Sequence, residues 1–149
     1  MASPYDLDNV YMSTAVLHSK LSKAIRKKVG AVLVTPQGVT LTGYNGTPIG
    51  IDNSCEDICA ETGEYITKPS VLHAEINCIL KAAREGVSVV DSTIYITLSP
   101  CLQCSAMLIQ AGVKKVVYLE QYRDEKGLQL LCLANIPTSK FEIKKDSNA

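Results

Sequence analysis

Residues 93–112 read TIYITLSPCLQCSAMLIQAG and predict a strand that leads directly into a helix. The first six residues, Thr93 to Leu98, are almost all β-branched, aromatic or aliphatic, which is typical of a buried strand. From Cys101 to Ala111 the pattern is helical, and Gly112 supplies a helix C-terminus. A strand followed at once by a helix is the repeating unit of α/β folds. These twenty residues therefore predict the α/β class.

Further strands and helices are predicted on both sides of this unit. The helices are expected at residues 5–27, 71–85 and 126–134, and the strands at 29–35, 39–43, 114–119 and 140–143. Residues 44–69 are rich in Gly, Pro and polar side chains, so we expect a long loop there, and no regular structure after residue 143. We expect a three-layer α/β/α sandwich around a mixed, mostly five-stranded sheet.

Composition limits the classes of protein to consider. A chain of 149 residues predicts one domain, residues 1–149. The formal net charge is 0, which argues against a nucleic acid polymer as the main partner. No apolar run approaches the ~18 residues of a membrane span, and no signal-peptide pattern is present at the start. We therefore expect a cytoplasmic protein whose six cysteines are core residues, metal ligands or nucleophiles.

Two short motifs lie at the starts of predicted helices. One is His73-Ala74-Glu75 and the other is Pro100-Cys101-Leu102-Gln103-Cys104. A histidine with two cysteines suits Zn²⁺, and three protein ligands leave the fourth tetrahedral position open, as in catalytic sites. Cys101 and Cys104 are three positions apart and share a helix face. The N-terminus of that helix favours their thiolate forms.

Glu75 is predicted to act on protons and not to bind the metal. His73 and Glu75 are two positions apart, and such residues do not face each other along a helix. Both side chains can converge only beyond the end of the helix. The sequence therefore predicts a catalytic zinc between two helix N-termini, with His73, Cys101 and Cys104 as ligands and Glu75 as general base.

A His-x-Glu motif with a downstream Pro-Cys-x-x-Cys motif is the signature of zinc-dependent nucleobase deaminases. Within that group the chain resembles the deoxycytidylate (dCMP) deaminases. In its short length it is similar to the compact bacterial or phage members. The matching segments are Val29-Gly30-Ala31-Val32, Gly43-Tyr44-Asn45-Gly46-Thr47-Pro48, His73-Ala74-Glu75-Ile76-Asn77 and Leu98-Ser99-Pro100-Cys101-Leu102-Gln103-Cys104. The resemblance implies a cytidine deaminase-like fold and a hydrolase that converts dCMP to dUMP and ammonia, for thymidylate synthesis.

The resemblance also implies which residues bind the substrate. Asn45 would bond the sugar, Tyr122 would lie beside the base, and Ala74 and Ser99 would reach the base edge. Ser22 and Arg26 match a Ser-x-x-x-Arg pattern of the family. On the predicted helix these two residues are four positions apart and share a face, where a hydroxyl and a guanidinium can hold a monophosphate. Arg26 belongs to a basic run of five residues in nine positions, Lys20, Lys23, Arg26, Lys27 and Lys28. The alternative for this basic run is a solvated helix face.

Regulation and assembly are implied by the resemblance alone. The segment Gly43, Tyr44, Asn45, Gly46 and Thr47 would bind a regulatory nucleoside triphosphate with Mg²⁺ at a subunit interface. There dCTP would activate the enzyme and dTTP would inhibit it. The family is commonly a homohexamer. Cys55 and Cys59 leave open whether a second, structural zinc is bound, because structural sites need four ligands.

Three alternative functions stay open at this stage. The first is a deaminase acting on a base in tRNA, which would bind RNA with a steep salt dependence. The second is a deaminase of free nucleosides or bases, which would not need a phosphate site. The third is a zinc-stabilised binding module without catalysis.

Overall fold

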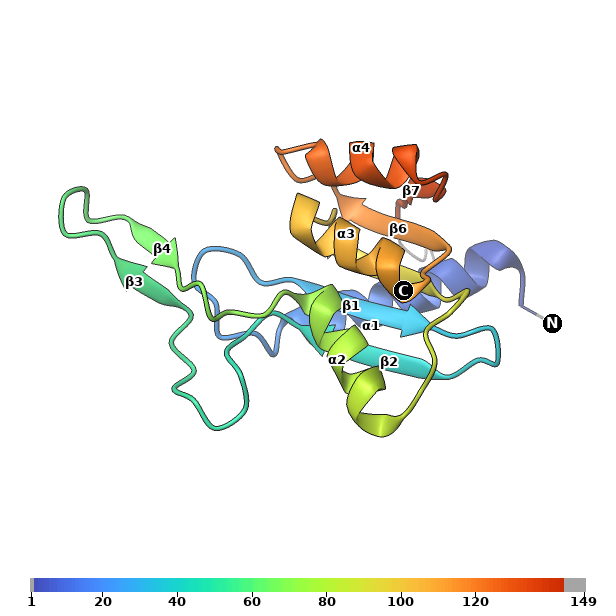
Figure 1. The fold of residues 1–149 in the computed structure, drawn as a ribbon, viewed down its shortest axis with the longest axis horizontal. Coiled ribbons are helices and arrows are strands. Elements are labelled where there is room, and N and C mark those ends of the chain that lie inside the picture. The colour runs from blue at the N-terminus through green and yellow to red at the C-terminus, as the bar shows by residue number, and fades with distance from the viewer. Residues whose placement is uncertain (1, 144–149) are drawn as a thin grey trace, which may run out of the picture.

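The computed structural model describes residues 2–143, so the expectation for residues 144–149 lies outside the described residues. Its centre is a five-stranded sheet (Figure 1). The sheet has the order β2-β1-β5-β6-β7. Its strands are β1 (Gly30–Val34), β2 (Thr40–Tyr44), β5 (Thr93–Leu98), β6 (Lys115–Glu120) and β7 (Thr138–Lys140). β1 is antiparallel to β2 and β5, whereas β5, β6 and β7 are parallel. The predicted mixed sheet is confirmed.

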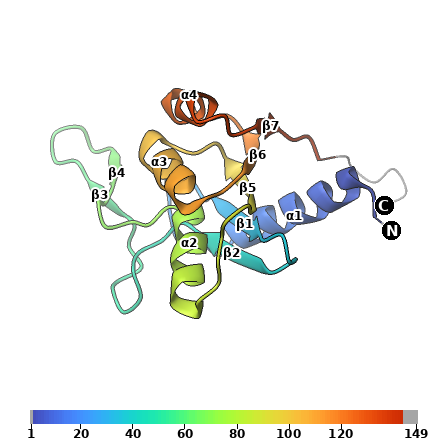
Figure 2. The ribbon, with the colours of Figure 1, turned by 45° about the vertical axis from the view of Figure 1, so that its right-hand side comes forward.

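Helices cover both faces of the sheet (Figure 2). They are α1 (Pro4–Ser19), α2 (Ala74–Glu85), α3 (Leu102–Ala111) and α4 (Lys126–Leu133). Successive strand residues point to opposite faces, so Tyr95 packs with Met12 of α1, while Ile94 and Ile96 pack in the core of the other three helices. The predicted α/β/α sandwich is therefore confirmed, with two separate apolar cores.

The predicted first helix is too long. Helix α1 ends at Ser19, not at residue 27. Beyond it, the Ser22 hydroxyl donates to the Asn45 carbonyl, and the Glu56 carboxylate accepts backbone N–H groups of the segment. These bonds replace the helical ones, so Ser22 and Arg26 do not share a helix face.

The predicted loop at 44–69 contains a small sheet. Strands β3 (Glu56–Ile58) and β4 (Tyr65–Thr67) pair antiparallel and project away from the main sheet as a β3–β4 arm, residues 56–67 (Figure 1). The last strand also differs from the prediction, because β7 spans Thr138–Lys140 and not residues 140–143. All three β7 residues are exposed, so no apolar alternation marks this strand in the sequence.

Candidate active site

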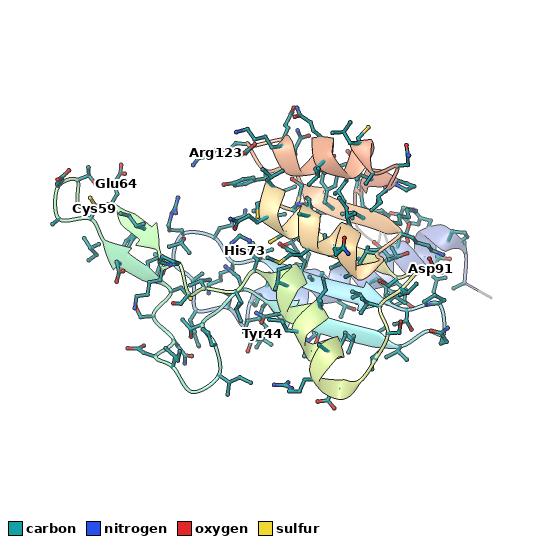
Figure 3. The ribbon with its side chains drawn as sticks, viewed as in Figure 1. Tyr44, Cys59, Glu64, His73, Asp91 and Arg123 are labelled. Carbon is teal, nitrogen blue, oxygen red and sulfur yellow. The ribbon has the colours of Figure 1, made fainter. Side chains whose placement is uncertain are left out.

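Two helix N-termini meet at one edge of the sheet. His73 is the N-cap of α2 and Cys101 is the N-cap of α3, both with extended backbone. Only Ser99 and Pro100 separate Cys101 from the end of β5. The chain therefore delivers both motifs to the same place, as predicted, with His73 pointing into the space between the two helices (Figure 3).

Three side chains from these termini form one cluster. The Nδ1 atom of His73 lies 3.1 Å from the Sγ of Cys104 and 3.6 Å from the Sγ of Cys101. All three ligand atoms lie within 4.8 Å of one another. Around tetrahedral zinc, with bonds of about 2.0 to 2.3 Å, ligand atoms lie roughly 3.5–3.8 Å apart. The cluster thus fits a zinc ion, and residues 2–143 contain no other such group.

Each member of the cluster alters the charge of its neighbours. A hydrogen bond from the Cys104 thiol, helped by His73, lowers the pKa of Cys101 to about 4. The same contact and burial raise the pKa of Cys104. Hydrogen bonding to Cys101 raises the pKa of His73. Without a cation only one thiolate is favoured here, whereas zinc deprotonates the thiols that bind it.

Glu75 lies in the first turn of α2 beside this cluster. Its side chain is only 3% exposed, and its Oε1 atom is 3.8 Å from the Nδ1 of His73. Burial raises the pKa of the Glu75 carboxyl. A carboxyl group whose pKa is moved toward neutrality can both accept and release a proton under physiological conditions. The position of Glu75 therefore suits proton transfer.

A cavity of about 230 Å³ opens on the cluster. His73, Glu75 and Cys101 lie on its wall. The predicted substrate residues that also line it are Arg26, Asn45, Ala74, Ser99 and Tyr122. Ser22 is buried and is not among the residues that line it. All but one of the predicted substrate residues thus meet around one space.

Asn45 anchors the backbone at this wall. Its side-chain Oδ1 accepts the N–H of Val29 at 2.9 Å, and its Nδ2 donates to the carbonyl of Lys27 at 2.8 Å. Its own carbonyl accepts the hydroxyl of Ser22. The predicted sugar-binding residue is therefore also what holds residues 22–29 in place.

A second set of backbone anchors also lies at this cavity. The Tyr122 backbone N–H donates to the Ser99 hydroxyl at 2.6 Å, and the Ser99 N–H donates to the Glu120 carbonyl at 2.8 Å. This pair of bonds ties the segment after β6 to the end of β5. Tyr122 is thereby held at the cavity.

Some cavity residues were missed by the sequence analysis. Lys27, Glu56 and Thr67 line the cavity. Lys27 pairs with Glu120 at 2.5 Å. Because Lys27 belongs to the basic run, its charge could have marked it in the sequence as a candidate phosphate contact. Glu56 and Thr67 lie in the predicted loop and are brought to the cavity only by the β3–β4 pairing. Nothing in the local sequence marks them.

The Gly43–Thr47 segment separates the first cavity from a second one of about 440 Å³. Gly43, Tyr44, Gly46 and Thr47 line the second cavity, while Asn45 lines the first. Asn77 donates to the Tyr44 carbonyl at 2.7 Å. The cationic residues on the second wall are Lys81 and Arg84.

Within the described part of the chain, no helix is both long and apolar enough to cross a membrane.

Comparisons with known proteins agree with this geometry. Residues 6–120 match the family model described as the cytidine and deoxycytidylate deaminase zinc-binding region. A deoxycytidylate deaminase of phage T4 is 35% identical, over 77% of this chain and 78% of its own length. A deoxycytidylate deaminase of Saccharomyces cerevisiae is 33% identical over 93% of this chain, which spans about half of that relative's length (46%).

Among solved structures, the dCMP deaminase of cyanophage S-TIM5 in complex with dCMP and dUMP has a similar fold. Its TM-score is 0.84 at 41% identity, and the match covers 95% of this chain and 100% of the phage chain. This match extends the likeness from the zinc-binding motifs to the whole sandwich.

Proposed function

This chain belongs to the cytidine and deoxycytidylate deaminase zinc-binding family, and on that premise we propose that it is a hydrolase that converts dCMP to dUMP and ammonia. The observation that carries the proposal is the cavity itself, whose wall holds Glu75 and Arg26 together with two of the three cluster residues, His73 and Cys101. The phage relative that binds dCMP and dUMP supports this substrate class.

His73, Cys101 and Cys104 would hold the zinc. When bound, zinc lowers the pKa of a water molecule that it coordinates to near neutrality. In the overall reaction, water adds an oxygen to C4 of cytosine and the amino group leaves as ammonia. The Glu75 carboxylate would accept a proton from the water, pass it to N3 of the ring and help to protonate the departing amine. Its burial supports this role, because a raised pKa lets one group perform both transfers.

Other residues of the cavity would orient the nucleotide. Tyr122 and the backbone at Ala74 and Ser99 would contact the base, and Asn45 would contact the sugar. Arg26 would bind the 5′-phosphate, since a guanidinium matches phosphate oxygens in geometry and charge. Ser22 would act on the phosphate only through the backbone that it fixes, given its bond to Asn45.

We also propose regulation at the second cavity. Gly43 to Thr47 would bind dCTP as activator and dTTP as inhibitor, with Mg²⁺ on the phosphates. Lys81 and Arg84 support this assignment as cations that line the same cavity. Because Asn45 lines the first cavity and its neighbours in the Gly43–Thr47 segment line the second, an effector bound in the second cavity can move a substrate contact in the first. A homohexamer of one-domain subunits would complete the site.

The test measures the turnover of several candidate substrates by the zinc-loaded protein. We expect turnover of dCMP to exceed turnover of deoxycytidine, which lacks the phosphate. An equal rate on deoxycytidine would favour a nucleoside deaminase, and activity on tRNA alone would favour an RNA deaminase. Addition of dCTP or dTTP tests the regulatory site separately. Indifference to both would remove the effector assignment and leave the chemistry intact.

A further inference from the structure

The segment from Lys20 to Val29 crosses the cavity wall without regular secondary structure. It carries Arg26, whose side chain is exposed and lines the cavity. A long side chain on an irregular segment samples many conformations, and each must be lost when an anion is bound. The contacts that fix this segment therefore affect how tightly Arg26 can bind an anion.

One cross-strand pair of the β3–β4 arm, called here a rung, fixes this segment in place. Glu56 and Thr67 are direct partners across the antiparallel pair. The residue Glu56 is only 8% exposed. Its Oε1 atom accepts hydrogen bonds from the backbone N–H of Ile25 at 2.8 Å and from that of Arg26 at 3.3 Å. The Oγ1 atom of Thr67 accepts the Nη1 of Arg26 at 3.3 Å. One rung thus contacts Arg26 at both its backbone and its guanidinium.

We propose that Glu56 and Thr67 are positioning residues that preorganise Arg26 for the 5′-phosphate of the substrate. The inference rests on the proposed function, because it takes Arg26 as the phosphate contact. The Glu56 carboxylate fixes the backbone through charge-assisted bonds, and the Thr67 hydroxyl aims the guanidinium. Ordering the arginine before the substrate arrives reduces the entropy lost on binding. The β3–β4 arm is then a part of the substrate site.

This role differs from a merely structural one in what it changes. Both residues act on the phosphate contact and not on the zinc cluster or Glu75. Loss of the preorganised orientation of the Arg26 guanidinium should raise KM for dCMP and leave kcat and zinc content unchanged. Damage to the arm as a whole would instead lower thermal stability and affect both kinetic constants.

The test uses Thr67→Val and Thr67→Ser as a matched pair in the full chain. Valine has nearly the shape of threonine and lacks only the hydroxyl, whereas serine keeps it. We expect Thr67→Val to raise KM for dCMP about fivefold to tenfold, which is the range for loss of an ordinary, exposed hydrogen bond. Thr67→Ser should stay within about twofold of wild type, with melting temperatures unchanged in both variants. Glu56→Gln, which keeps an acceptor but loses its charge, should raise KM by a smaller factor than Thr67→Val.

A double-mutant cycle with Arg26→Ala makes the test specific. In the Arg26→Ala background, Thr67→Val should have no further effect on KM. An equal effect with and without Arg26, or an unchanged KM in Thr67→Val, would overturn the inference. A wild-type protein that deaminates dCMP while Thr67→Val behaves as wild type contradicts this inference alone. A wild-type protein inactive on dCMP contradicts the proposed function and this inference with it.

Discussion

The Nδ1 atom of His73 lies 3.1 Å from the Sγ atom of Cys104, although 31 positions separate the two residues in the chain. The contact joins the N-cap of α2 to the first turn of α3. Both helices pack on the same face of the sheet. The candidate metal centre is therefore a product of tertiary packing, and a metal bound there would fasten two helices together.

Removal of zinc should therefore destabilise the fold. At a hundredfold excess of zinc over its Kd, binding contributes about 3 kcal/mol to the free energy of unfolding. We expect a chelator, or Cys104→Ser, to lower the melting temperature and to abolish activity. Cys132→Ser is the matched control, because Cys132 is an exposed thiol outside the cluster. Equal melting temperatures with and without zinc would argue against this site.

Replacement of Glu75 by glutamine should separate metal binding from proton transfer. The amide keeps the shape of the side chain but cannot accept the proton, so we expect kcat to fall roughly 10²- to 10⁴-fold. Zinc content, measured by elemental analysis, should remain that of wild type, since Glu75 is not in the three-ligand cluster. Loss of zinc together with activity would make Glu75 a ligand.

The buried thiol of Cys78 predicts a pH dependence of stability. Burial raises its pKa from 9.0 to about 12, so the folded protein keeps this proton at pH values where the unfolded chain loses it. The associated stability is complete below pH 9 and is lost as the pH rises toward 12. Between pH 8 and pH 10.5, wild type should lose about 2 kcal/mol more than Cys78→Ala in urea unfolding. Parallel losses in both proteins would assign the alkaline sensitivity elsewhere.

Two glycines of one segment should respond differently to alanine. A Cβ at Gly43 would lie 2.5 Å from the Ala74 carbonyl oxygen and 3.0 Å from the Cys78 sulfur, whereas a Cβ at Gly46 meets nothing within 4 Å. Gly43→Ala forces β2 away from α2 and should cost about 1–3 kcal/mol of unfolding free energy. Gly46→Ala should stay within roughly 0.5 kcal/mol. Similar stabilities of the two variants would contradict the close packing of β2 on α2.

Much of the fold follows from local pattern. The strand at Thr93–Leu98 has the predicted bounds, and the C-caps of helices α2 and α3 are Gly86 and Gly112, both in the left-handed conformation. The place of the metal site was also predictable. His73 and Glu75 are two positions apart, so their side chains can converge only beyond the N-terminal end of their helix. The strand bounds and the helix ends depend on neighbours in sequence, whereas the meeting of the two metal-binding motifs depends on tertiary packing.

The features that the sequence did not predict depend on distant partners. Helix α1 stops at Ser19 because residues after it bond to Asn45 and Glu56, which lie more than twenty positions away. The β3–β4 pair has three-residue strands and few buried side chains, so it carries no apolar alternation. Ser22 and Arg26 therefore do not share the helix face that the sequence predicts, although Arg26 does reach the cavity.

The most direct measurement is the product formed from dCMP by zinc-loaded protein, followed by ultraviolet absorbance and chromatography, with Glu75→Gln at the same zinc content alongside. We expect wild type to form one dUMP and one ammonia for each dCMP consumed, and the variant to react at least about a hundredfold more slowly. Wild-type protein with full zinc content that leaves dCMP unchanged, with or without dCTP, would contradict this expectation.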